Sequence, residues 1–342
     1  MIDTNLTPSV RIILPFYFFG AVWLLASSIL LLLNGEMLHG HFFNPALLSI
    51  THMIVLGYIT SLIFGALFQL LPVISGKQLY SERSILYAFM IFQVSLVVFC
   101  TKFYLFQPDS IFIGSAFGIL MAISWFACHA FISLKEAKSI SVDFIKSSLL
   151  WLLLVCGIGV IMAMNFKLAI LPADHIKILS LHFFSGLGGW IILLIIGVSS
   201  KLIPMFLLSK SDELKNLEWV WYGINFCLLL NLLNSITNLK IPFVIVFTPG
   251  IVGILIYLWY IVDLYKKRIR KKIDTALKQT RNTFFMLLIS IFFLVAVLSM
   301  ENPHPKNYSI FFILIIFGFI GYLIKVQIFK TLPFIVWTFL YK

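Results

Sequence analysis

Charged residues are scarce in this sequence, and their scarcity excludes a soluble protein. Asp, Glu, Lys and Arg make up 11% of the 342 residues, whereas hydrophobic residues make up 61%. Soluble domains are roughly 45–50% apolar and about 25% charged, so this chain carries more apolar surface than one core can bury. The same composition excludes intrinsic disorder, which needs low hydrophobicity and high net charge. The sequence therefore predicts an integral membrane protein.

Acidic residues are lacking in the middle of every apolar segment. All 13 Asp and Glu residues fall in predicted loops or at the ends of spans. Proton relays and many ion-coupled transporters depend on carboxylates inside the membrane, so this absence argues against a proton pump. The sequence also lacks a GxxxxGK[ST] loop, a Ser/His/Asp arrangement and an HExxH string. Nothing therefore indicates an ATP-driven machine or a hydrolase.

Paired cysteines are missing as well. The chain has four cysteines, and each lies alone in a different apolar segment. No CxxC exists, so neither a thiolate metal site nor a redox pair is indicated. We expect these residues to act as small packing residues: Cys100, Cys128, Cys156 and Cys227.

Long apolar runs are what the sequence has in abundance. Runs of about 20 residues match a ~30 Å hydrocarbon core, whereas the strands of a membrane barrel would alternate over about 10 residues. We expect an all-α, polytopic helical membrane protein that forms a single integral membrane domain over 1–342, with a short amphiphilic tail at 331–342. The ten predicted spans are 11–34, 45–75, 84–106, 109–134, 146–165, 176–208, 218–239, 241–263, 283–300 and 308–328.

The net charge of +12 is concentrated beside the spans. Loops after the even-numbered spans carry fifteen basic residues, eight of them between Lys266 and Arg281, and loops after the odd-numbered spans carry five. Basic loops face the cytoplasm, so we expect both termini inside, in a bacterial-type inner membrane. The partner of the basic loops is then the lipid bilayer and not nucleic acid. The N-terminus lacks the features of a cleaved signal peptide, so the first span should insert as it stands.

Three spans share a pattern of glycine and proline. The matching residues are Gly65 and Pro72 in the second span, Gly197 and Pro204 in the sixth, and Gly321, Lys325 and Pro333 in a weaker copy in the tenth. The copies lie four spans apart, which is the mark of an internal repeat. We therefore expect three four-helix arcs at about 11–134, 146–263 and 283–342, the last one truncated.

Two histidines fall inside the matched spans. His52 and His182 each lie seven residues within the outer end of their predicted span, which is roughly 10 Å deep at 1.5 Å per residue. Buried histidines in membranes usually have a partner, and two imidazoles can bind haem iron from opposite faces. The alternative is a pair of hydrogen-bonded packing histidines. The neighbouring glycines could admit a flat ring or simply permit close helix packing: Gly57, Gly186, Gly188 and Gly189.

Four further histidines lie on the expected outer side, two of them as a His-x-His. Imidazole-rich sites suit copper or zinc, so these residues are candidates for a second, solvent-facing metal site. The alternative is that they are separate loop residues with no common ligand. The four are His39, His41, His175 and His304.

The repeat segments resemble the haem-copper oxidase subunit I superfamily, in particular its short oxidase-like and NnrS-type members. The resemblance implies three four-helix arcs in a pseudo-threefold array, a haem b ligand at His52, and a metal or haem ligand at His182. It also implies a context of haem, copper and nitric oxide. The sixth span lacks the family's histidine pair and the tenth has no histidine, so a working oxygen reductase is not expected. The resemblance is carried by 51–57, 65–72, 181–190, 197–206 and 332–337.

Three hypotheses follow for the function. The first is a membrane protein that binds haem, or haem and copper. It would transfer electrons or handle a small gas such as nitric oxide at the outer face, together with a redox partner. The second is a carrier or assembly factor for copper or haem that docks its cargo at the outer histidines. The third is a cofactor-free structural subunit of a respiratory complex. Whether the chain is an enzyme is left open by the residues themselves.

Overall fold

The computed structural model describes residues 8–36, 43–171, 175–209, 214–237, 239–300 and 304–340. Within these ranges the chain is helical and contains no strand. The helices are α1 (Val10–Leu33), α2 (Pro45–His52), η3 (Met53–Thr60), α3 (Ser61–Ser75), α4 (Glu82–Tyr104), α5 (Ser110–Ser133), α6 (Ile140–Leu168), α7 (His175–Phe184), η4 (Ser185–Ile192), α8 (Leu193–Leu207), α9 (Leu214–Thr237), α10 (Phe243–Lys266), α11 (Thr275–Leu298), α12 (Pro305–Ile313), η5 (Leu314–Gly321) and α13 (Tyr322–Leu340).

The predicted spans are confirmed as helices. Among the described residues, ten helical runs are long and apolar enough to cross a membrane. The chain is therefore a polytopic all-α membrane protein in contact with the lipid bilayer. The predicted tail at 331–342 is helical as far as Leu340, because α13 continues past Pro333.

Three of the ten spans have a composite structure. The second, sixth and tenth spans each consist of an α-helix, an eight-residue π-helix (labelled η) and a further α-helix without a break in the chain. The remaining seven spans are single α-helices. The π-helices therefore mark the same three spans that the glycine and proline pattern relates to one another.

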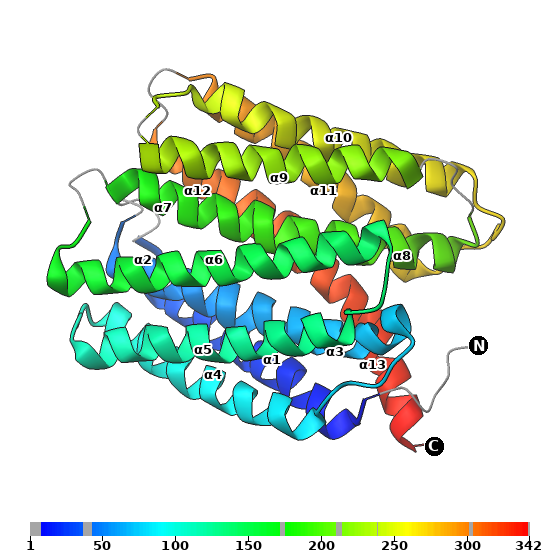
Figure 1. Cartoon of the computed structure of the whole chain (residues 1–342), viewed down its shortest axis with the longest axis horizontal. Coiled ribbons are helices and arrows are strands. Elements are labelled where there is room, and N and C mark those ends of the chain that lie inside the picture. The colour runs from blue at the N-terminus through cyan, green and yellow to red at the C-terminus, as the bar shows by residue number, and fades with distance from the viewer. Residues whose placement is uncertain are drawn as a thin grey trace. The chain divides into compact units, whose positions relative to one another are not determined.

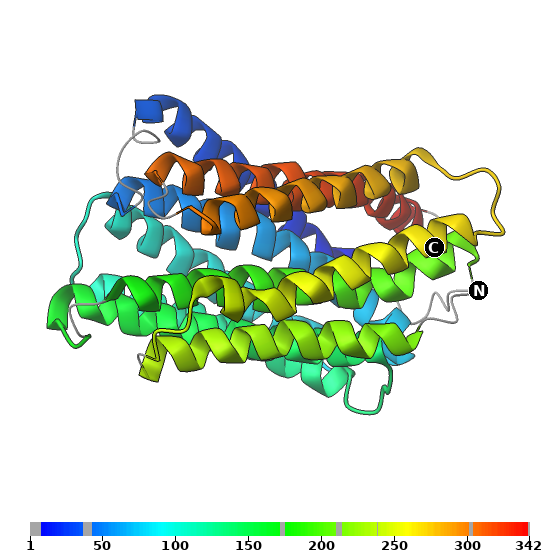
Figure 2. The ribbon, with the colours of Figure 1, turned by 90° about the horizontal axis from the view of Figure 1, so that it is seen from above.

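The chain separates into two compact units. The first comprises Met1–Ala137, Cys156–Ala173 and Phe334–Lys342, and the second comprises Lys138–Val155 and Asp174–Pro333. In the first unit, α4 and α5 run side by side (Figure 1). In the second unit α9 and α10 do the same (Figure 1), and α11 lies along the run from α12 to α13 (Figure 2).

The ends of the helices follow from local sequence. Asp109 and Asp274 cap α5 and α11 by accepting the backbone N–H groups of Phe112 and Leu277, at 2.9 and 2.8 Å. Such caps satisfy amide groups that have no partner within the helix. At the other end of a span, α3 stops at Gly76, whose φ of +68° is a left-handed conformation that glycine adopts without strain.

The core of the first unit is built from phenylalanine. The Phe16 ring contacts the rings of Phe68, Phe89 and Phe126, with centroids 4.3 to 5.9 Å apart. Phe64 joins the same cluster at 4.8 Å from Phe126. Tilted and edge-on rings of this kind attract one another beyond simple burial. The abundant phenylalanine therefore serves interior packing as well as contact with lipid.

Candidate functional site

The three π-helices align the repeats residue by residue. In each, the fifth residue is a glycine and the sixth a buried aromatic residue, and a proline follows 19 residues after the first. The aligned positions are Gly57, Tyr58 and Pro72; Gly189, Trp190 and Pro204; and Gly318, Phe319 and Pro333. This register keeps the predicted match of the second and sixth spans. It corrects the third copy: Gly321 was predicted to match Gly65 and Gly197, but that position is Val326 in this register. Gly318 instead matches Gly57 and Gly189.

In two repeats this glycine packs against a tryptophan from the span before it. A Cβ atom at Gly57 would lie 2.4 Å from Cγ of Trp23, and one at Gly189 would lie 2.6 Å from Cγ of Trp151. The space that a porphyrin would need over these glycines is thus taken by indole rings. Close packing was the alternative explanation for both residues, and it describes what the structure has there. A Cβ atom at Gly188 would lie 3.4 Å from Cδ2 of Leu228, which is ordinary van der Waals contact.

Each tryptophan is held by an amide side chain of the span that follows the π-helix. Trp23 Nε1 donates to Gln93 Oε1 at 2.7 Å, and Trp151 Nε1 donates to Asn225 Oδ1 at 2.9 Å. Tyrosine and tryptophan polar groups normally find such a partner when buried. The two tryptophan–amide pairs therefore repeat one packing device, which the search for histidines in the sequence did not reveal.

His52 is the last residue of α2 and stands immediately before the first π-helix. Its Nδ1 lies 2.7 Å from the carbonyl oxygen of Leu48, one helical turn earlier. A carbonyl only accepts, so the proton resides on Nδ1 and the lone pair of the ring is on Nε2. The half-buried ring lies against Phe99 and Phe103 of α4, with centroids 5.3 and 5.7 Å away. This hydrogen bond to a backbone carbonyl is typical of histidines that ligate metals.

His182 occupies a different position in its repeat. It lies three residues before its π-helix begins, whereas His52 lies one residue before. Two residues correspond to roughly 3 Å along a helix and about 200° around it. The repeat counterpart of His52 is Phe184, whose ring contacts Phe247 at 4.3 Å. The two histidines are therefore not equivalent positions, although both are half-buried in matched spans.

The outer histidines are only partly described. His39 and His41 lie outside the described residues, and the side chain of His175 does as well. His304 is exposed, and its Nδ1 accepts the backbone N–H of Lys306 at 3.2 Å, which caps α12. Among the described residues, no group of three or more His, Cys, Asp or Glu side chains is placed to hold a metal ion. The proposed copper site remains a prediction.

The seventh histidine has a packing role. His129 is buried in α5, and its Nε2 lies 2.6 Å from Ser84 Oγ and 3.2 Å from Trp125 Nε1. An indole N–H only donates, so Nε2 of His129 acts as the acceptor and is already engaged. His129 thus differs from His52, in which Nδ1 is the engaged nitrogen.

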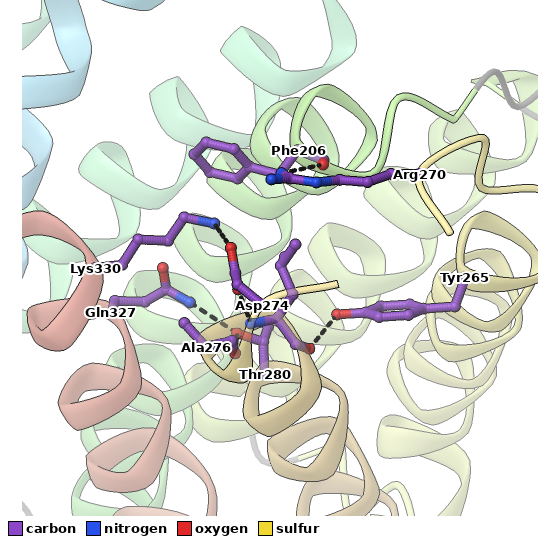
Figure 3. Close-up of polar contacts among 9 residues, drawn as sticks. Phe206, Tyr265, Arg270, Asp274, Ala276, Thr280, Gln327 and Lys330 are labelled. Atoms are coloured by element: carbon purple, nitrogen blue, oxygen red, sulfur yellow. Dashed lines mark hydrogen bonds and ion pairs between the residues drawn. The ribbon is translucent and has the colours of Figure 1, made fainter. Parts of the chain in front are cut away.

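A second polar cluster lies where α8 ends and α11 begins. Lys330 of α13 reaches Asp274 at 3.5 Å, and Gln327 one turn earlier donates to Thr280 Oγ1 at 3.0 Å (Figure 3). Tyr265 of α10 donates to the carbonyl of Leu277 at 2.7 Å. These contacts join α10, α11 and α13 within the second unit. The sequence signal that pointed to this region was the concentration of basic residues between Lys266 and Arg281.

The fold defines the class of protein as multi-pass, all-α and membrane-spanning. The chain matches no protein-family model and no curated protein.

Proposed function

We propose that this chain is a haem-binding membrane protein in which His52 supplies an axial nitrogen to the iron. The observation that carries the proposal is the hydrogen bond from Nδ1 of His52 to the carbonyl of Leu48. It orients the ring and puts the lone pair on Nε2, the arrangement a ligand needs. The resemblance of 51–57 and 65–72 to the oxidase subunit I group supports the same residue.

The fit of the other candidate residues is uneven. His182 is the second candidate ligand, for haem or for copper, because it is the remaining half-buried histidine in a repeat span. Gly57 and Gly189 do not fit as a platform for the ring, since Trp23 and Trp151 cover them. A haem would supply an iron that changes oxidation state or binds a small gas. The protein would contribute orientation through Leu48 and exclusion of water through Phe99 and Phe103.

The proposal includes a location and a direction. The ten spans among the described residues would return both termini to one side. The concentration of basic residues in the loops on that side supports an orientation with both termini in the cytoplasm of a bacterial-type inner membrane. His52 then lies toward the outer face, where electrons or a gas such as nitric oxide would be exchanged with a redox partner. The absence of carboxylates in the middle of the spans favours this role over proton pumping.

The test is the reduced-minus-oxidised visible spectrum of the purified protein, with iron and copper measured on the same sample. We expect haem b bands in the parent protein and their loss in His52→Ala. His52→Met should retain a haem with shifted bands, because a thioether can also ligate iron. His129→Asn is the matched control. It replaces another histidine in a membrane-spanning helix, one whose Nε2 is hydrogen-bonded to Ser84 and Trp125.

Two outcomes would contradict the proposal. One is a folded, metal-replete preparation that contains no haem. The other is a haem spectrum that His52→Ala leaves unchanged, which would remove His52 from the site. Copper that is lost on replacement of both His39 and His41, in a preparation without haem, would instead support the carrier hypothesis.

A further inference from the structure

The loop between α10 and α11 brings two cations to one phenylalanine. Arg270 donates from Nη1 to the carbonyl oxygen of Phe206 at 3.4 Å, and its backbone N–H donates to Leu207 at 3.3 Å. Lys330 of α13 places its ammonium 3.5 Å from the centre of the Phe206 ring. Figure 3 shows both side chains converging on Phe206, with Asp274 beside Lys330.

Each of the two cations has only long, weak contacts with its described acceptors. Asp274 is the ion-pair partner of Lys330 among the described residues, and their N–O separation of 3.5 Å is longer than a strong charged hydrogen bond. The same carboxylate also caps α11 through Leu277. Arg270 has five N–H donors, and its one described side-chain hydrogen bond is the long one to Phe206. Among the described residues, the positive charge of Arg270 and Lys330 therefore exceeds the negative charge placed beside them.

The surrounding segment adds to the excess. Eight basic residues lie between Lys266 and Arg281, against Asp274 as the single acidic residue of that segment. The next acidic residue, Asp263, is already paired with Lys267 at 2.9 Å. Within the described part of the chain, the basic residues of this segment therefore outnumber the acidic residues that could neutralise them.

The position of the cluster suggests what kind of anion. α8 ends at Leu207, α10 ends at Lys266 and α11 begins at Thr275, so the cluster stands where membrane helices end. Large apolar side chains are exposed beside it, with Ile269 at 70% and Phe329 at 81%. A group that combines a phosphate with apolar chains matches both features.

We propose that Arg270 and Lys330 form a binding site for the phosphate of an anionic phospholipid, with Phe206 between them and the acyl chains along Phe329. The lipid would neutralise the two cations and hold the end of α8 against α11 and α13. The site is independent of the haem proposal, because it involves none of the histidines.

Native mass spectrometry of the detergent-purified full chain tests the site, with phosphatidylglycerol, phosphatidylcholine and inorganic phosphate as separate probes. We expect saturable binding of phosphatidylglycerol, and about fivefold weaker binding for each cation removed in Arg270→Gln and Lys330→Gln. Lys278→Gln is the matched control, because it removes the same charge from the same segment at an exposed residue. Arg270→Lys and Lys330→Arg should retain most of the binding.

Three results would overturn the proposal. Equal binding of phosphatidylcholine would show that the net charge of the lipid does not determine binding. Equally tight binding of inorganic phosphate would show that the acyl chains do not contribute. An equal loss in Lys278→Gln would show a diffuse basic surface instead of a site. Lipid binding is measured on the ions of the folded protein alone. A glutamine variant that folds poorly is therefore assessed from its folded fraction and from the variant that keeps the charge at the same position.

Discussion

Single polar side chains in the spans are mostly satisfied by the backbone of their own helix. Thr51 donates to Leu47, Thr280 to Ala276 and Ser290 to Met286, each to the carbonyl four residues earlier. His52 follows the same rule through Leu48. The hydrogen bond that orients its ring is therefore formed within one helical turn.

Asp109 offers a test of an exposed charge at a helix end. Its carboxylate pairs with Lys102 at 2.7 Å and caps α5 through Phe112, and these two contacts lower the pKa of Asp109. A lowered pKa in the folded state stabilises the fold above the unfolded pKa of about 3.9. That contribution is lost as the pH falls through the lower, folded pKa.

We expect Asp109→Asn to be less stable than the parent at pH 7 and the difference to shrink below about pH 4. Asparagine is also a good N-cap, so the substitution removes the charge pair with Lys102 and keeps the cap. Thermal unfolding of the detergent-solubilised protein from pH 7 to pH 3 measures the difference. A gap that stays constant over this range would mean that Asp109 does not titrate as the contacts indicate.

At the scale of the element, the π-helices are what distinguish three spans from the other seven. A π-helix is rare and is often found at functional sites. Here each one places an aromatic residue in the interior, and in two of the three the glycine lies against a tryptophan of the preceding span.

The repeat glycines differ in what they face, and substitution should reveal it. A Cβ atom at Gly57 or Gly189 would meet tryptophan at 2.4 or 2.6 Å, whereas one at Gly318 would meet nothing within 4 Å. We expect Gly57→Ala and Gly189→Ala to destabilise by about 1–3 kcal/mol through overpacking. Gly318→Ala should be neutral or slightly stabilising, because alanine favours helix.

Thermal unfolding of the three variants side by side checks this expectation. Gly318 is the internal control, because it occupies the same place in its π-helix. Equal destabilisation at all three positions would point to the π-helical backbone as the cause and remove tryptophan packing from the explanation.

At the scale of the whole molecule, the distribution of basic residues predicts the orientation of the chain in the membrane. Gln107 lies exposed in the loop between α4 and α5, and Lys271 lies exposed in the basic loop after α10. In a cysteine-free background, we expect Gln107→Cys to react with a membrane-impermeant thiol reagent in intact cells. Lys271→Cys should react with the same reagent only after the membrane is permeabilised. The reverse result would invert the proposed topology and place His52 toward the cytoplasm.

The sequence by itself determined the class of protein, the ten spans and the relation among the second, sixth and tenth of them. These properties depend on hydrophobicity over about 20 residues and on spacing along one helix, both of which are local. The hydrogen bond of His52 to Leu48 is local as well, but it became known only from the structure.

Only the tertiary structure decided which glycines are covered, which register relates the repeats, and that His182 is not the counterpart of His52. Trp23 lies 34 residues from Gly57, and Gln93 lies 70 residues from Trp23. Such contacts arise from packing between helices, and a run of leucine, isoleucine and phenylalanine does not state which face meets which neighbour. For the same reason, the convergence of Arg270 and Lys330 on Phe206 could not be predicted from a charge-rich loop alone.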